Sequence, residues 1–170
     1  MARTRVKICG ITRNRDARAA VAAGADAIGL VFFAGSSRAV APEAAREIVT
    51  GLPPFCSVVG LFVNADRADV IAACSMLPLS LLQFHGEEDA AFCASFGRPW
   101  MKAIRVAEDT DIDAEIDAYP GASAILLDTW VKGSHGGTGQ SFDWRRVPTG
   151  SRVPLVLAGG LKPDNVGAAI

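Results

Sequence analysis

The feature that most constrains this chain is the alternation of short apolar runs with segments of helical spacing. Seven runs are typical of β-strands: 5–9, 27–33, 57–63, 79–85, 100–106, 124–129 and 153–158. Most are continuously apolar over four or more residues, the pattern of strands covered on both faces, as in a parallel sheet. Strands that alternate with helices in this way predict an α/β fold with right-handed crossovers.

The intervening segments carry helix start signals. We expect helices capped by Thr12, opened by Pro42, preceded by Asp66, over 87–95, over 111–119, and opened by Pro163. Gly24 is expected just past the end of the first helix. A glycine-rich loop over 130–141 and a short stretch over 142–146 follow the sixth strand.

Two parallel architectures fit this alternation, an open doubly wound sheet and a closed barrel. An open dinucleotide-binding sheet would carry GxGxxG after its first strand, where this chain has Cys9-Gly10-Ile11-Thr12. We therefore expect a (β/α)8 TIM barrel in a single domain over 1–170, with seven strands visible. The sequence stops within the helix expected after Pro163, so we expect the last strand–helix unit of the barrel to be missing.

Composition and charge exclude several classes of protein. Half of the residues are hydrophobic and the formal net charge is −1, which argues against disorder and against a nucleic-acid partner. No apolar run reaches the roughly 20 residues that span a bilayer. The four cysteines form no CxxC pair and only two histidines accompany them, so we expect free thiols and no metal. Without a signal-peptide pattern, we expect a cytoplasmic protein with no membrane partner.

Chemically active residues concentrate at the carboxyl ends of the expected strands, where barrel active sites lie. Cys9 ends the first strand, and Asp128 follows three aliphatic residues in the sixth. A thiol that loses a proton and a buried carboxyl that donates one suit an isomerase. Arg38, after the second strand, could bind a substrate carboxylate, and His85 ends the fourth strand. Each also has an ordinary structural explanation: a buried thiol, a loop cap, a surface arginine and a structural histidine.

Two glycine-rich stretches are candidates for binding phosphate. Gly137 lies in the long loop, and Gly159 and Gly160 end the seventh strand. Glycines let backbone N–H groups approach an anion, and the N-terminus of a helix opened by Pro163 would favour the same charge. The alternative is that these glycines only turn the chain.

A series of motifs, in order and from Val6 onward, resembles the phosphoribosylanthranilate isomerase family. The motifs are Lys7-Ile8-Cys9-Gly10-Ile11-Thr12, Ser36-Ser37-Arg38, Val59-Gly60-Leu61-Phe62-Val63-Asn64, Gln83-Phe84-His85-Gly86, Leu126-Leu127-Asp128, Gly136-Gly137-Thr138-Gly139, and Leu157-Ala158-Gly159-Gly160-Leu161 with Asn165-Val166. Each tripeptide alone is weak evidence, whereas the full series is strong evidence.

The resemblance implies an Amadori rearrangement of an aminoaldose phosphate, in tryptophan biosynthesis, without cofactors. It implies Cys9 as general base, Asp128 as general acid, Arg38 at the anthranilate carboxylate, and Gly159 and Gly160 at the phosphate. We expect His85 and Gly137 to contact the substrate too. The expected assembly is a monomer or homodimer.

Two alternatives stand beside this interpretation. The histidine-pathway isomerase performs the same chemistry but is expected to have an aspartate at the position of Cys9. The second alternative is a non-catalytic phosphate-ligand binder or an inactive fragment, for which Cys9→Ala would change no measurable property.

Overall fold

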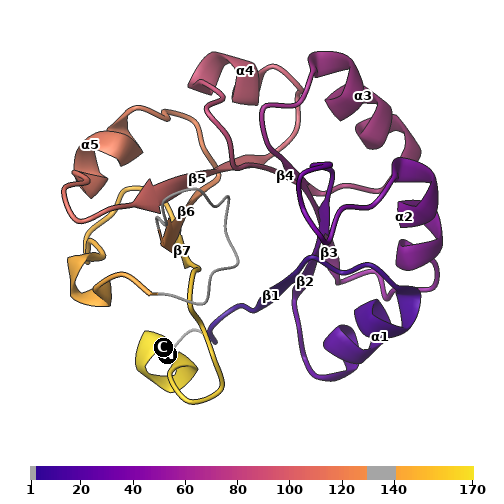
Figure 1. Cartoon of the computed structure of the whole chain (residues 1–170), viewed down its shortest axis with the longest axis horizontal. Coiled ribbons are helices and arrows are strands. Elements are labelled where there is room, and N and C mark those ends of the chain that lie inside the picture. Colours follow the sequence, from indigo (N-terminus) through magenta and orange to yellow (C-terminus); the bar gives the residue numbers. More distant parts are fainter. Residues whose placement is uncertain (1–2, 130–140) are drawn as a thin grey trace.

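In the part of the chain that the structure describes, seven parallel strands form one curved sheet at the centre of the molecule (Figure 1). The computed structural model describes residues 3–129 and 141–170. The strands, in order across the sheet, are β1 (Lys7–Cys9), β2 (Ala27–Val31), β3 (Ser57–Phe62), β4 (Leu81–Phe84), β5 (Trp100–Val106), β6 (Ala124–Thr129) and β7 (Leu155–Leu157). All seven predicted strands are confirmed, and each boundary lies within a few residues of the predicted one.

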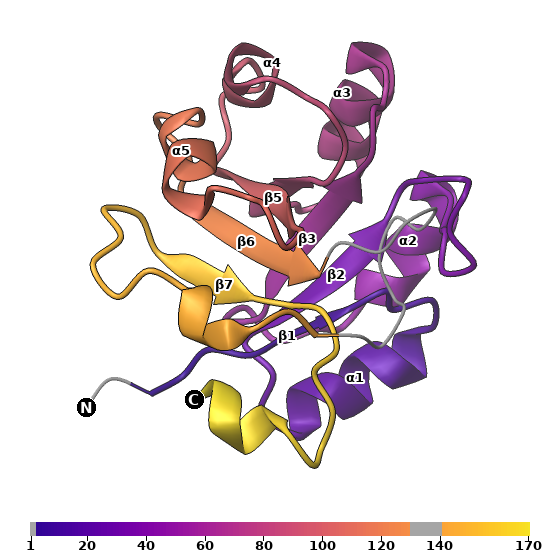
Figure 2. The same cartoon turned by 60° about the vertical axis from the view of Figure 1, so that its left-hand side comes forward.

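The predicted complete barrel is confirmed only in part. Among the described residues, β1 pairs with β2 alone and β7 pairs with β6 alone, so the sheet curves without closing. The short helix that follows β7 lies beside β1 in both views (Figures 1 and 2). The architecture shown is therefore an incomplete α/β barrel of seven parallel strands.

Among the described residues, five α-helices cover the outer face of the sheet (Figure 1): α1 (Asn14–Ala22), α2 (Pro42–Val49), α3 (Arg67–Met76), α4 (Ala90–Ala94) and α5 (Ile112–Asp117). Pro42 occupies the first turn of α2, and Gly24 adopts φ +97° just past α1, both as predicted. Asp89 and Asp111 cap α4 and α5 by accepting hydrogen bonds from Phe92 and Ala114.

Two predicted helix starts are wrong. Helix α1 begins at Asn14 with Arg13 at its N-cap, so Thr12 lies outside the helix. The side chain of Asn14 instead donates to carbonyls at the end of α2 and so ties α1 to α2. No α-helix opens at Pro163: the chain forms a short 3₁₀-helix, η2 (Val166–Ala169), which contains Gly167. A similar turn, η1 (Trp144–Arg146), follows β6.

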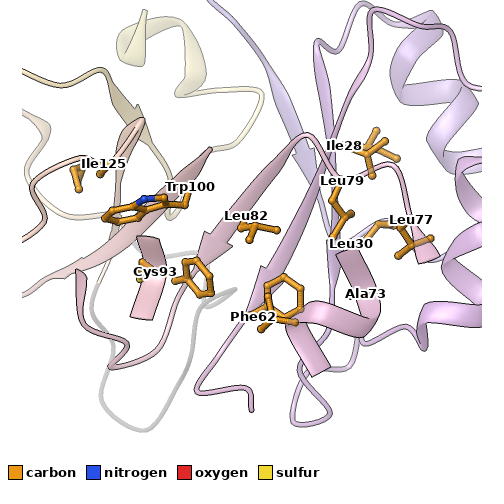
Figure 3. Packing of buried hydrophobic residues seen from close by; sticks show 14 of the residues in the cluster. Ile28, Leu30, Phe62, Ala73, Leu77, Leu79, Leu82, Cys93, Trp100 and Ile125 are labelled. Atoms are coloured by element: carbon orange, nitrogen blue, oxygen red, sulfur yellow. The ribbon is translucent and has the colours of Figure 1, made fainter. Parts of the chain in front are cut away.

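Alternate residues along each strand pack on opposite faces of the sheet. Phe62, Leu82, Trp100 and Ile125 belong to the larger core, between the sheet and its helices (Figure 3). The inner face carries a smaller cluster of Val59, Met101, Ala103 and Leu126. Because both faces are covered, the strands are apolar throughout, which explains the continuous runs in the sequence.

A buried ion pair fixes the loops at the carboxyl ends of β3 and β4. Lys102 Nζ lies 2.9 Å from Glu88 Oε2, and both side chains are almost fully buried. The Glu88 carboxylate also accepts hydrogen bonds from the backbone N–H groups of Asn64 (2.7 Å) and Gly86 (2.8 Å). These bonds satisfy the buried charges. They hold rigid the backbone that follows His85.

Within the described part of the chain, no helix is long and apolar enough to cross a membrane.

Candidate active site

A cavity of about 1220 Å³ opens on the inner face of the sheet and reaches the carboxyl ends of the strands. Its lining includes six of the seven residues predicted from the sequence: Cys9, Arg38, His85, Asp128, Gly159 and Gly160. Gly137 lies outside the described residues. The structure thus brings together groups that are separated by up to 151 positions in the chain.

Cys9 ends β1 with its thiol on the inner face of the sheet. Its neighbour across the pair is Gly29, which lies opposite Cys9 in the register of β1 and β2. A Cβ atom at position 29 would lie only 2.8 Å from Cys9 Sγ. Gly29 therefore provides the space that the thiol occupies, a role that sequence analysis missed.

The other three thiols are poor candidates for reaction as thiolates. Burial raises the pKa of Cys56 and of Cys74, and it raises the pKa of Cys93 to about 12. None of the three lines the cavity. The candidate nucleophile or base among the cysteines is therefore Cys9.

Asp128 lies near the end of β6 and is 7% exposed. One carboxylate oxygen, Oδ1, accepts a hydrogen bond from the N–H of Thr129 at 2.9 Å. The other, Oδ2, lies 3.2 Å from Nε2 of His85. Asp128 is therefore in contact with the imidazole of His85. The positions of these two residues at the ends of their strands did not predict this contact.

Gly159 packs directly against Asp128. A Cβ atom at Gly159 would lie 2.6 Å from Asp128 Oδ1 and 2.6 Å from the backbone nitrogen of Thr129. Gly159 and Gly160 also adopt φ +79° and +67°, a region that other residues rarely enter. Glycine is required here both for the backbone turn and for the space beside the carboxyl group.

Arg38 lies at the mouth of the cavity and contacts the end of β1. Its guanidinium donates a hydrogen bond to the carbonyl of Cys9 at 2.8 Å and lies against Gly10, which has φ +82°. This contact holds the guanidinium end of a side chain that is otherwise exposed. The remaining N–H groups of the guanidinium are available to an anion.

Replacing Gly10 with alanine is expected to displace Arg38. The added methyl group would overlap the guanidinium, and alanine at this φ costs about 1–2 kcal/mol in backbone strain. We expect a lower Tm together with a raised KM for a carboxylate-bearing substrate. Gly24→Ala is the matched control, because Gly24 also has positive φ but faces open space. An equal KM in both variants would contradict a positioning role for Gly10.

Two further cavity residues had no role assigned from the sequence. Gln83 lies in β4, 1% exposed, and its amide nitrogen is 3.0 Å from Nδ1 of His85. Lys7 lines the cavity on the same face of β1 as Cys9. The sequence did carry a signal for both residues. Each is a polar residue in an otherwise apolar strand, and each stands two positions before a predicted site residue, so that their side chains share a face of the sheet.

Among the described residues, no group of three or more His, Cys, Asp or Glu side chains could hold a metal ion. That the chain needs no metal stays a prediction.

Comparisons with known proteins agree on one family. A family model described as N-(5'phosphoribosyl)anthranilate (PRA) isomerase matches residues 6–170. An N-(5'-phosphoribosyl)anthranilate isomerase of Pseudomonas fluorescens is 59% identical over 170 residues, which is all of this chain and 81% of the relative.

Solved structures of the same name share the fold. Phosphoribosyl anthranilate isomerase from Thermotoga maritima is 38% identical with a TM-score of 0.84, over 99% of this chain and 82% of that one. A second structure, in complex with reduced 1-(o-carboxyphenylamino)-1-deoxyribulose 5-phosphate, is 38% identical with a TM-score of 0.81, over 99% and 81% of the two chains.

Proposed function

The chain belongs to the N-(5'-phosphoribosyl)anthranilate isomerase family, and we propose that Cys9 and Asp128 are the general base and general acid of its reaction. It is an aldose–ketose isomerase of tryptophan biosynthesis. Its substrate is N-(5-phosphoribosyl)anthranilate, and its product is 1-(2-carboxyphenylamino)-1-deoxyribulose 5-phosphate. The step is an Amadori rearrangement, the third from chorismate.

In the first half of the reaction, Asp128 donates a proton to the furanose ring oxygen. The bond from that oxygen to sugar C1 breaks, its electron pair stays on the oxygen, and the anthranilate nitrogen forms a double bond to C1. In the second half, the Cys9 thiolate removes the proton from C2. The C–H electrons form the C1–C2 double bond, and the π electron pair of the C1–N double bond returns to the anthranilate nitrogen. The resulting enol tautomerises to the ketone, so atoms and electrons balance without a cofactor.

The observation that carries this proposal is the shared cavity. Cys9 at the end of β1 and Asp128 near the end of β6 line the same space, together with apolar residues such as Val31, Leu61 and Leu126. An acid and a base on different strands can face a substrate held between them, and such positioning lowers the barrier in addition to the proton transfers.

The two anionic ends of the substrate have different candidate partners. We assign the phosphate to the backbone N–H groups around Gly159 and Gly160, whose positive φ values leave the backbone open to an anion. The anthranilate carboxylate is assigned to Arg38, whose planar guanidinium suits bidentate binding. His85 lies beside Asp128 and is proposed to contact the reacting part of the sugar. Gly137 remains a proposed contact outside the described residues.

Arg38→Ala is expected to raise KM by about 10-fold or more while kcat changes less, because a charge-assisted bidentate contact is lost from the ground state as well as the transition state. The measurement is initial rates, followed by loss of substrate fluorescence, for the substrate and for an analogue without the anthranilate carboxylate. Wild-type enzyme should have a higher KM for the analogue, whereas Arg38→Ala should not distinguish the two. If the variant still discriminates as wild type does, another residue binds the carboxylate.

The finer features of the fold and assembly are also proposals. We propose that the single domain is of the (β/α)8 class, with the space between β1 and β7 as the place of an eighth strand, since each of these strands has an unpaired edge among the described residues. We propose that the assembly is a monomer or a homodimer; the phosphoribosylanthranilate isomerase of Thermotoga maritima is described as dimeric. We propose a cytoplasmic location, which the four free thiols support.

A further inference from the structure

A line of three buried polar side chains crosses the inner face of the sheet, from β4 to β6. The amide nitrogen of Gln83 lies 3.0 Å from Nδ1 of His85, and Nε2 of His85 lies 3.2 Å from Oδ2 of Asp128. Gln83 is 1% exposed, and His85 and Asp128 are each 7% exposed. Buried polar groups favour defined partners, so the donors and acceptors of these two contacts can be assigned from chemistry. The other amide atom of Gln83, Oε1, is buried without a hydrogen-bond partner among the described residues.

The backbone around His85 is held on both sides, so its ring orientation is set by the two side-chain contacts. The N–H of His85 donates to the carbonyl of Phe62 at 2.8 Å, and its carbonyl accepts from Arg105 at 3.1 Å. The Glu88 carboxylate holds the next residue, Gly86. The side-chain torsions of His85 are not fixed by these backbone bonds. The ring is oriented by Gln83 at Nδ1 and by Asp128 at Nε2.

The hydrogen on the imidazole follows from these two neighbours. A neutral imidazole has one donor nitrogen and one acceptor nitrogen. The amide nitrogen of Gln83 only donates, so Nδ1 accepts and the hydrogen is on Nε2, which faces Asp128. The opposite rotation of the Gln83 amide would require an Nδ1 hydrogen and would turn the lone pair of Nε2 toward Asp128. The 3.0 Å contact joins Nδ1 to the amide nitrogen of Gln83, which is the first arrangement. Once Asp128 has given its proton to the substrate, its oxygens carry only lone pairs, and the hydrogen on Nε2 can then donate to them.

We infer that Gln83 is a positioning residue that holds His85 as the Nε2–H tautomer, so that His85 cannot take the proton that Asp128 gives to the substrate. This inference rests on the proposed role of Asp128 as general acid. With the lone pair of Nε2 facing Asp128 at 3.2 Å, the acidic proton would bond to the imidazole instead of the furanose ring oxygen. With a hydrogen on Nε2, His85 can only donate, and it orients the carboxyl group for the substrate. The angle of this contact is not that of a well-aligned hydrogen bond, as is common for catalytic groups before substrate binds.

The first test reads the tautomer directly in the wild-type chain. Two-bond ¹H–¹⁵N correlation spectra distinguish protonated from unprotonated imidazole nitrogens, and the chain has only two histidines. The His85→Asn variant identifies the His85 signals. We expect an unprotonated Nδ1 and a protonated Nε2 at neutral pH. The opposite tautomer, or an imidazolium with both nitrogens protonated, would overturn the inference.

The second test reverses the hydrogen bond. Gln83→Glu places an acceptor at Nδ1, which draws the imidazole hydrogen to Nδ1 or makes an imidazolium that holds Asp128 ionised. Either result removes the general acid, so we expect kcat to fall about 10-fold or more with KM little changed. Gln83→Leu leaves Nδ1 without a partner and should give a smaller fall and a mixture of tautomers in the same spectra. An unchanged kcat in a folded Gln83→Glu variant would overturn the inference.

Ser80→Ala is the matched control for loss of a hydrogen bond from a neighbouring position. The Ser80 hydroxyl donates to the carbonyl of Val58, just before β4 and away from the cavity, so kcat should be unchanged. Two failures can be told apart. If Asp128→Asn is inactive but Gln83→Glu is fully active, the role of Gln83 is wrong and the proposed acid stands. If Asp128→Asn keeps its activity, the proposed acid is wrong, and the inference about Gln83 falls with it.

Discussion

Asp128→Asn is expected to lower kcat by about 10²–10⁴-fold, the range for loss of a proton-transfer group. The side chain keeps its size, and one side-chain oxygen can still accept from the N–H of Thr129. The amide cannot supply the proton that the furanose ring oxygen needs when its bond to C1 breaks. Substrate binding depends on groups at the two ends of the substrate, so KM should change much less than kcat.

The measurement is the initial rate of loss of substrate fluorescence, with Tm measured for the same preparations. Asp111→Asn is a suitable control, because asparagine also caps helices well and Asp111 lies away from the cavity. A kcat near the wild-type value in a folded Asp128→Asn variant would remove Asp128 from the mechanism.

Cys9→Ala is expected to lower kcat by a similar factor, about 10²–10⁴-fold, because it removes the base that takes the C2 proton. The structural change is small, because the Cys9 side chain is half-buried and its thiol lies in the space beside Gly29. The fold should therefore persist, and the variant should still bind the product.

The matched control is Cys74→Ala, which removes a half-buried thiol from α3 outside the cavity. Its kcat should equal that of wild type, because burial raises the pKa of Cys74 and disfavours a thiolate there. If Cys9→Ala and Cys74→Ala have the same kcat, Cys9 is not the general base.

Much of the fold could be predicted because each strand is covered on both faces. Burial on both faces removes polar residues from the strand, as in β3, where five of six residues are buried, so the strands stand out as continuous apolar runs. The same physics marks the site, since a polar residue at the end of such a run is conspicuous. Cys9, His85 and Asp128 were predicted in this way as candidate site residues, and the structure places all three in the lining of one cavity.

The features that sequence analysis missed depend on contacts between distant segments. Thr12 satisfies the sequence rule for a helix cap, but α1 begins at Asn14, whose amide bonds to the end of α2. The helix expected at Pro163 is a short 3₁₀-helix instead, in a segment where Gly167 weakens helical preference.

The roles of Gln83 and Gly29 were missed for the same reason. The contact of Gln83 with Nδ1 requires knowledge of the rotamers of two side chains, one in β4 and one just after it. The contact of Gly29 with the Cys9 thiol requires the register between β1 and β2. Neither rotamers nor register can be read from residue types alone.

The most direct test of the account is turnover of freshly generated N-(5-phosphoribosyl)anthranilate by the chain of residues 1–170 and by its Cys9→Ala/Asp128→Asn double variant, measured side by side. The acid and the base act in successive steps, so the double variant should be about as slow as the slower single variant, whereas the unaltered chain forms product. Equal rates for the two proteins, or no product from either, would contradict the account.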